Sequence, residues 1–355
     1  MRQEELKSYN ALAVACSSNY KTLKNFFEEK ESWKAAFEHF RSSNAGLFKE
    51  RTIDVQEEWQ KLEKHNVRLI LNSDPEFPAA LKEIPWPPFG IYLKGAPLNK
   101  NEKLVAIVGT RKATSEGKNT AKSFAKILTE NGITVVSGLA LGLDAAAHEG
   151  VLEVRGRAIV VLANGLDRVY PRQNESLAKK ILELGGTLIS EYPIGSPSLR
   201  ERFIERNRIV SGLSLGTVIV EAPSKSGSLA TARFALEQNR EVFVVPGDLR
   251  HPNYVGSHEL IKAGAALVTS PADVLIALNL ENFSAQAKLT TQKLALQNLD
   301  ENQKAVINVL NQAGGKIAID QIAELADLET ALVNRSLGFL VIQGMIKEEN
   351  GKYYI

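Results

Sequence analysis

Arginine, lysine and small polar residues gather at the ends of several short apolar runs, and these residue types bind phosphate groups. They are Arg111 after VAIVGT, Arg206-Asn207-Arg208 in RERFIERNRIV, and Lys225 before Ser226-Gly227-Ser228. Guanidinium groups grip phosphate oxygens with paired hydrogen bonds, and exposed backbone N–H groups near glycine favour anions. The pattern therefore predicts an anion-binding site that phosphate groups can occupy.

Small residues follow almost every one of these apolar runs. The segments are Gly109-Thr110-Arg111, Ser137-Gly138, Asn164-Gly165, Ser190-Glu191, 222–228 and Pro246-Gly247-Asp248. Small side chains let a backbone approach a phosphate closely, although glycine also serves tight strand–helix turns. Six such loops favour a ligand site, but the signatures G-x-G-x-x-G and G-x-x-x-x-G-K-[ST] are absent, so the glycines do not name the ligand.

Some of these charged residues have structural alternatives. Arg206 and Arg208 have Glu201 and Glu205 as near neighbours in the sequence, so structural salt bridges are an alternative to phosphate binding. Asp144 and His148 stand four residues apart on a predicted helix, but two metal ligands without a third make a poor site. We interpret that pair as a structural hydrogen bond, and we predict no catalytic residue, metal site or cofactor.

The elements that must position these residues alternate between Leu104 and Leu280. The runs VAIVGT, ITVVSG, AIVVLANG, TLISEY, TVIVEA and EVFVVPG are continuously apolar, as in strands covered on both faces. Amphipathic segments separate them, near 117–130, 144–154, 174–184, 202–213 and 228–239. This order predicts the α/β class with a doubly wound, mostly parallel sheet. Ligands bind beyond the carboxyl ends of such strands, so the candidate residues should meet at one edge.

Composition divides the rest of the chain. Residues 1–66 contain no proline and repeat phenylalanine and tryptophan at helical spacing, which predicts a small helical N-terminal domain. Six of the 13 prolines fall in residues 67–103, which we interpret as a lead-in to a core domain over 67–280. Residues 281–298 are polar and read as a linker. Residues 299–355 predict three helices and a hairpin, the outline of a winged-helix domain.

The overall composition sets limits on location and partners. The 355 residues are 44% hydrophobic and carry 43 basic and 41 acidic side chains, so a nucleic-acid partner needs a local basic patch. The single cysteine, Cys16, excludes an internal disulfide and fits a reducing compartment. The start lacks a signal peptide and no apolar run is long enough for a bilayer, so we expect a cytoplasmic protein without membrane contact.

Six ordered motifs resemble those of one known family. They are VAIVGTRKATSEGK, VVSGLALGLDAAAHEG, VLANGLDRVYPRQN, ISEYPIG, FIERNRIVSGLS and EAPSKSGSLATARFALEQNREVFVVPGD. They resemble the DNA-processing protein A family (DprA, also called Smf) over about residues 67–280. The resemblance implies a Rossmann-like core that binds single-stranded DNA, forms a homodimer and is not an enzyme. It also implies that the protein protects incoming DNA and loads a RecA-type recombinase during natural transformation.

The resemblance also implies particular site residues. The DNA contacts, with Lys225 added from the residue pattern, are Gly109, Thr110, Arg111, Ser137, Gly138, Arg172, Asn174, Lys225, Arg206, Asn207, Arg208, Ser226, Gly227 and Ser228. The dimer contacts match Ile261 and Leu267. Family members often have a lysine where this chain has Glu175, which puts one phosphate contact in question. The N-terminal domain is SAM-like or helix-hairpin-helix-like, but it lacks a clear glycine hairpin, so we assign it no DNA binding.

Two other functions compete with this interpretation. A nucleotide-binding enzyme similar to phosphoribohydrolases needs a glutamate in the loop at 225–232, but the next acid is Glu237, nearly two helical turns further on. A transcription factor would act through the winged helix. Residues 282–355 carry seven basic and eight acidic side chains, so we expect this domain not to be the main DNA-binding element.

Overall fold

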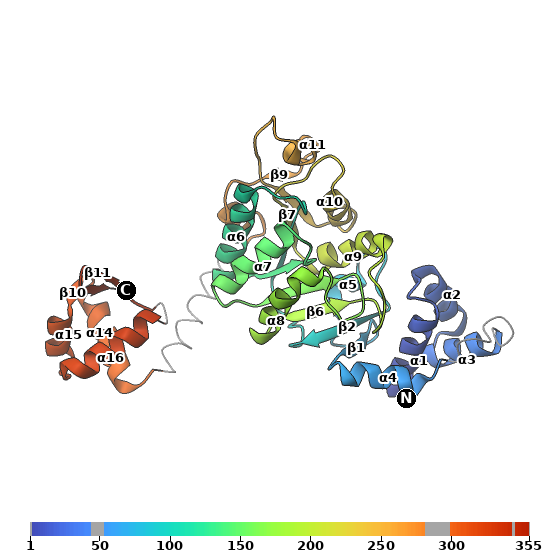
Figure 1. Cartoon of the computed structure of the whole chain (residues 1–355), viewed down its shortest axis with the longest axis horizontal. Helices are drawn as coiled ribbons and strands as arrows, with labels where there is room; N and C mark the ends of the chain where they lie inside the picture. Colours follow the sequence, from blue (N-terminus) through green and yellow to red (C-terminus); the bar gives the residue numbers. More distant parts are fainter. Residues whose placement is uncertain (1, 44–52, 281–298, 343–344, 355) are drawn as a thin grey trace. The chain divides into compact units, whose positions relative to one another are not determined.

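The computed structural model describes residues 2–43, 53–280, 299–342 and 345–354 of the chain. The chain divides into two compact units, residues 1–284 and 285–355 (Figure 1), and each is described by itself. Within the described ranges, no helix has the length and apolar character needed to cross a membrane. The predicted linker at 281–298 lies outside the described residues.

A nine-stranded sheet forms the centre of the first unit in its described part, with strand order β1-β2-β6-β5-β4-β3-β7-β8-β9. The strands are β1 (Arg68–Leu71), β2 (Gly90–Gly95), β3 (Leu104–Val108), β4 (Thr134–Ser137), β5 (Ala158–Leu162), β6 (Thr187–Ser190), β7 (Gly216–Ile219), β8 (Glu241–Val244) and β9 (Ala266–Leu267). Strands β3 to β9 are mutually parallel, while β1 and β2 pair antiparallel at one end. The proline-rich lead-in therefore extends the sheet.

Helices cover both faces of this sheet, which confirms the predicted doubly wound α/β fold. One face carries α6 (Ser115–Glu130), α7 (Leu143–Glu153), α8 (Glu175–Glu183) and α12 (Pro271–Ala277), and the other carries α5 (Ala79–Lys82), α9 (Arg200–Leu213), α10 (Gly227–Glu237) and α11 (Val255–Lys262). Val105 and Ile107 of β3 point to the first face, and Ala106 and Val108 to the second. Both sets are buried, which explains why the strand sequences are continuously apolar.

The chain reverses its winding direction at β3. This strand pairs with β4 on one side and with β7 on the other. Val108, at the end of β3, lies beside Ile219 at the end of β7. A doubly wound sheet opens a crevice beyond the carboxyl ends of such neighbouring strands, and ligands bind there. The fold thus places the loops after β3, β4 and β7 around one crevice.

The N-terminal helices share the hydrophobic core of the sheet. They are α1 (Arg2–Ala15), α2 (Tyr20–Lys30), α3 (Trp33–Ser43) and α4 (Val55–Lys64). Tyr9 and Trp33 are buried in one cluster with Phe89 and Tyr92 of the lead-in, and the Tyr92 hydroxyl donates to Asn10 Oδ1 at 2.9 Å. The boundary that the sequence predicts at residue 66 therefore divides one packed unit, because the aromatic face of the bundle packs against the lead-in.

The second unit has the predicted winged-helix outline. Its elements are α14 (Glu301–Ala313), β10 (Ile317–Ala318), α15 (Ile319–Ala326), α16 (Thr330–Ile342), β11 (Lys347–Glu349) and β12 (Lys352–Tyr354). The strands form an antiparallel sheet in the order β10-β12-β11. Asn350 and Gly351 connect β11 to β12 with positive φ angles of 53° and 72°, as a tight hairpin turn requires. Val306, Ile322 and Leu337 belong to a hydrophobic core of its own.

Candidate functional site

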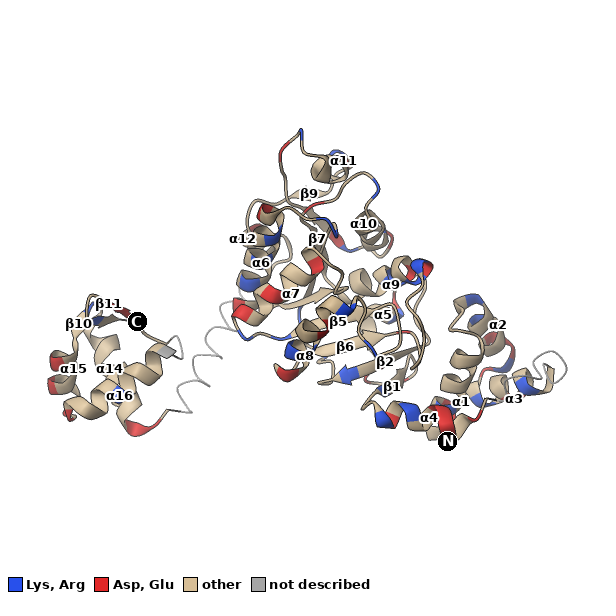
Figure 2. Ribbon diagram, in the orientation of Figure 1, with Lys and Arg blue, Asp and Glu red and all other residues tan. Residues whose placement is uncertain are grey.

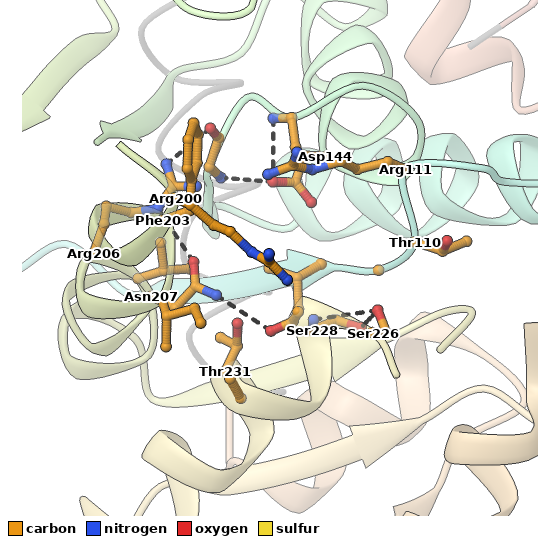
Figure 3. Close-up of a pocket in the computed structure, with 18 of the residues that line it drawn as sticks. Thr110, Arg111, Asp144, Arg200, Phe203, Arg206, Asn207, Ser226, Ser228 and Thr231 are labelled. Atoms are coloured by element: carbon orange, nitrogen blue, oxygen red, sulfur yellow. Dashed lines mark hydrogen bonds between the residues drawn. The ribbon is translucent and has the colours of Figure 1, made fainter. Parts of the chain in front are cut away.

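A cavity of about 690 Å³ opens beyond the carboxyl ends of β3, β4 and β7, between the N-terminal turns of α9 and α10 (Figure 3). Ten of the fourteen predicted contact residues line it: Gly109, Thr110, Arg111, Gly138, Arg206, Asn207, Lys225, Ser226, Gly227 and Ser228. These residues come from four segments between Gly109 and Ser228, which together span more than 100 positions of the sequence. The winding reversal brings them together.

Three exposed cations line the cavity, namely Arg111, Arg200 and Lys225. None of the three forms an ion pair with any carboxylate in the described part of the chain. The Arg111 guanidinium lies over the ring of Phe203, 5.0 Å from its centroid, and Tyr170 lies 5.5 Å from the same ring. The cavity therefore combines uncompensated positive charge with an aromatic wall.

Sequence reasoning missed Arg200 and Phe203, which belong to the first turn of α9. Arg202 and Arg206, four residues apart, share another face of this helix. Arg202 instead donates to the carbonyls of Pro197 and Ser17 and is buried. The residues of α9 that face the cavity could have been recognised from their spacing. Arg200, Phe203 and Asn207 follow one another at intervals of three and four residues, which places them on one side of the helix.

The N-terminus of α10 forms a second positive element of the cavity. The Ser226 side chain accepts a hydrogen bond from the Ser228 backbone N–H at 3.3 Å, and the two hydroxyls lie 2.7 Å apart. A Cβ atom at Gly227 would meet no atom within 4 Å, so the backbone there is open to a ligand. The unpaired N–H groups of a helix N-terminus attract anions, and Lys225 adds a full charge beside them.

Arg206 lies at the back of the cavity and is 4% exposed. Its Nη1 donates to the carbonyl oxygens of Gly138, at 2.9 Å, and Val161. Asp144 Oδ2 accepts from the backbone N–H groups of Gly138 and Ala140, at 3.1 and 3.3 Å. Burial lowers the pKa of Arg206 to about 10, while the nearby charge of Asp144 opposes that shift, so the guanidinium remains charged at neutral pH. Arg206 and Asp144 together brace the loop after β4.

The salt-bridge alternative for Arg206 and Arg208 named the wrong carboxylates. Within the described ranges, neither guanidinium pairs with the side chain of Glu201 or Glu205. Arg208 is 3% exposed and pairs with Glu191 at 2.6 Å, a residue distant in sequence. It also donates to the Trp86 carbonyl at 2.9 Å, so its guanidinium is engaged away from the cavity.

The other predicted contacts outside the cavity have different surroundings. Ser137 is buried and its hydroxyl donates to the Ile107 carbonyl at 2.7 Å. Asn174 is also buried and donates to the Leu139 carbonyl at 2.8 Å, which supports the loop after β4. Arg172 is exposed and lines a separate hollow of about 620 Å³. The basic and acidic side chains lining that hollow are Lys94, Arg168, Arg172, Lys179, Asp167 and Glu175.

The hydrogen bond predicted between Asp144 and His148 is wrong. Asp144 faces the loop after β4, and no hydrogen bond joins it to His148 among the described residues. His148 is fully buried, and burial lowers its pKa to about 3, so the imidazole is neutral. No group of three His, Cys, Asp or Glu side chains in the described ranges is arranged to hold a metal ion.

Glu221, which follows β7, holds the loops around the crevice by hydrogen bonds. The sequence alone did not indicate this role. Its buried carboxylate accepts from the Thr114 N–H at 3.2 Å, the Thr114 hydroxyl and Asn253 Nδ2 at 2.8 Å. Its backbone carbonyl accepts from the Thr110 N–H at 2.9 Å. The loop that carries Arg111 is thus held at both ends. The only sequence signal was an acid inside the run TVIVEA.

The two residues expected at a dimer interface lie near the β9 edge of the sheet. Leu267 belongs to β9 itself, and its side chain is 50% exposed. Ile261 belongs to α11 and packs partly against the core of the second face. β9 pairs only with β8 among the described strands, so this edge is open.

A doubly wound sheet with a basic, aromatic-walled cavity at its winding reversal places the chain in the Rossmann-like class of α/β proteins. The chain belongs to the DNA recombination-mediator protein A family, whose model matches residues 68–279. This confirms the family that the six motifs indicate.

Relatives agree with this assignment. The chain is 42% identical to Protein Smf of Escherichia coli (strain K12) over 64% of its own length and 60% of that protein's length. It is 35% identical to Protein Smf of Synechocystis, with 83% of this chain and 82% of that protein covered.

Two solved structures resemble the fold. DNA processing protein A of Streptococcus pneumoniae has a TM-score of 0.59 and 34% identity, covering 68% of this chain and 81% of that one. DNA processing protein A of Helicobacter pylori, described for its single-stranded DNA binding mode, has a TM-score of 0.53 and 31% identity, covering 60% and 95%.

Proposed function

We propose that this protein binds single-stranded DNA in the cavity at the winding reversal and acts as a mediator without catalytic chemistry. The observation that carries the proposal is the set of exposed, unpaired cations Arg111, Arg200 and Lys225 around one cavity beside the α10 N-terminus. The Helicobacter pylori relative is described as binding single-stranded DNA, which supports the same ligand class here.

The chemistry of the cavity fits a flexible single strand. Guanidinium and ammonium groups, with the N–H groups of α10, suit phosphates, and the rings of Phe203 and Tyr170 suit unpaired bases. Every base offers a π-face, so stacking tolerates any sequence. A duplex hides its base faces inside the stack. We therefore expect a preference for single strands over duplex with little dependence on sequence.

The predicted contacts divide into two roles in this proposal. The residues that line the cavity contact the strand. Arg206, at the back of the cavity, acts mainly by supporting the loop after β4. Arg172 extends the contact on the exposed surface beyond Tyr170, where it faces a basic hollow. Ser137, Asn174 and Arg208 are buried and engaged with backbone or Glu191, so they support the surrounding loops.

We also propose a finer role, which family membership supports. In this proposal the protein protects incoming DNA and loads a RecA-type recombinase during natural transformation. It acts as a homodimer through the β9 edge, where Leu267 offers exposed apolar surface. Sedimentation of Leu267→Arg is expected to show monomers while the parent protein sediments as a dimer. An unchanged dimer would move the interface elsewhere.

A competition experiment tests the central proposal. A labelled oligothymidylate is bound to the protein and displaced with unlabelled single strand, duplex or mononucleotide. Displacement by single strand at far lower concentration than by the other two supports the proposal. Equal competition by duplex would contradict it. Preferential competition by a mononucleotide would favour the nucleotide-binding enzyme.

A further inference from the structure

Two packed helices form one side of the cavity. α9 and α10 pack against each other, and Asn207 of α9 and Ala230 and Thr231 of α10 line the cavity. Phe234 follows Ala230 by four residues, which places it on the same side of α10 and about 6 Å further along the helix. A half-buried aromatic ring thus lies about one helical turn beyond the cavity lining.

Trp86 lies beside that ring. Its side chain is 53% exposed, and its ring centroid lies 6.4 Å from that of Phe234 with an interplanar angle of 62°. Its backbone is held in place, because the carbonyl accepts a hydrogen bond at 2.9 Å from the buried Arg208 and prolines flank it on both sides. A large aromatic side chain is therefore presented to solvent from a fixed backbone.

We propose that Trp86, backed by Phe234, is a second stacking site that receives a base of the strand after it leaves the cavity along α9 and α10. The inference rests on the proposed function. Its ligand is single-stranded nucleic acid because the surface continues a cavity lined by unpaired cations, to which a polyanion is drawn. Trp86 adds a π-face with no sequence preference.

Oligonucleotides of different lengths distinguish binding at this site from binding in the cavity. Binding of oligothymidylates of increasing length is measured for the parent protein, Trp86→Ala, Trp86→Phe and Arg111→Ala. Trp86→Ala is expected to weaken binding of long strands about fivefold to a hundredfold, the equivalent of one stacked base. It is expected to leave the shortest bound strands unaffected, because these fill only the cavity. Trp86→Phe is expected to retain most of the long-strand affinity.

Fluorescence gives a second readout. Trp33 is 2% exposed, whereas Trp59 of α4 is half-buried and serves as the matched control. Long strands are expected to quench the parent emission and to leave the Trp86→Phe emission largely unquenched. Trp59→Phe is expected to keep both the quenching and the affinity of the parent.

Three outcomes would overturn the inference. Trp86→Ala could match the parent on long strands while Arg111→Ala binds weakly, which would exclude a role for Trp86 and leave the proposed function standing. Equal weakening at every length, in Trp86→Ala and Trp86→Phe alike, would indicate a general structural effect, which melting curves would also reveal. If the parent protein binds no single strand, the proposed function fails, and this site fails with it.

Discussion

Arginines that look alike in the sequence differ in what their guanidinium groups touch. Arg111 is exposed and lies over Phe203 at the mouth of the cavity, without a carboxylate partner in the described chain. Arg206 borders the same cavity, but its donors are used by the Gly138 and Val161 carbonyls. The first can bind a phosphate at little structural cost, whereas the second supports the loop after β4. We therefore expect substitution of Arg111 to weaken DNA binding and substitution of Arg206 to destabilise the fold.

Arg111→Ala is expected to weaken single-strand binding by about 1.5–3 kcal/mol, the value of a hydrogen bond to a charged group. The logarithmic dependence of affinity on salt should become shallower by about 0.7, the contribution of one phosphate contact. Titrations at several salt concentrations measure both quantities, and the melting temperature should not change. A slope identical to that of the parent would mean that Arg111 touches no phosphate.

Arg206→Ala is expected to destabilise the fold by about 1–3 kcal/mol for each of the buried Gly138 and Val161 carbonyls that loses its donor. Denaturant unfolding measures this loss. Arg200→Ala is the matched control: it removes an exposed arginine from the same helix and cavity, so DNA affinity should fall with no change in stability. Weak binding by Arg206→Ala at undiminished stability would instead assign that residue a direct contact.

At the scale of elements, the sequence predicts the helices and strands, because their residue patterns repeat locally. It does not predict contacts between residues that are far apart in the sequence. The six apolar runs and five helical segments of the core appear as β3 to β8 and α6 to α10 because each has its own periodicity. The two-residue strand β9 and the short helix α12 are too brief to leave such a signal. Phe203 and Glu221 were missed because their partners lie elsewhere: Arg111 and Tyr170 for one, Thr114 and Asn253 for the other.

The loop after β4 leaves no room for a side chain at Gly142. This glycine has a φ of 85°, and a Cβ atom would lie 2.4 Å from the Thr110 carbonyl oxygen and 2.7 Å from that of Arg111. Gly142→Ala is expected to lower the melting temperature and weaken DNA binding, since it displaces the segment that carries Arg111. Gly227→Ala is the control for stability, because a Cβ atom there meets nothing within 4 Å. Equal melting temperatures for the two variants would contradict the prediction.

At the scale of the whole molecule, charge separates the two units. Basic and acidic residues are interspersed over the first unit, whereas α15 of the second carries acidic residues and no lysine or arginine (Figure 2). The described part of the second unit carries five basic and eight acidic residues. Its third helix, α16, bears a single arginine, Arg335, and exposes Leu332 and Phe339. Such a surface repels phosphates, so the basic cavity of the first unit is the expected DNA site.

Removal of the residues after 284 is expected to change single-strand affinity by no more than about 1 kcal/mol, the scale of one neutral hydrogen bond. The first unit should stay folded, because the second has a separate hydrophobic core. Anisotropy titrations of the shortened and full-length proteins provide the comparison. Complete loss of binding by a folded, dimeric first unit would show that the winged helix binds DNA after all.

The shared core of the N-terminal helices and the sheet has a consequence for how such genes can change. Tyr9 and Trp33 pack in one core with Phe89 and Tyr92, so a substitution in either pair requires a compensating substitution in the other. Recombination that joined these helices to a foreign sheet would leave mismatched aromatic surfaces exposed. The buried residues of the second unit form a separate hydrophobic core. Recombination can therefore replace the carboxyl-terminal unit as a whole. Substitutions in the amino-terminal helices must instead be matched by substitutions in the sheet that these helices cover.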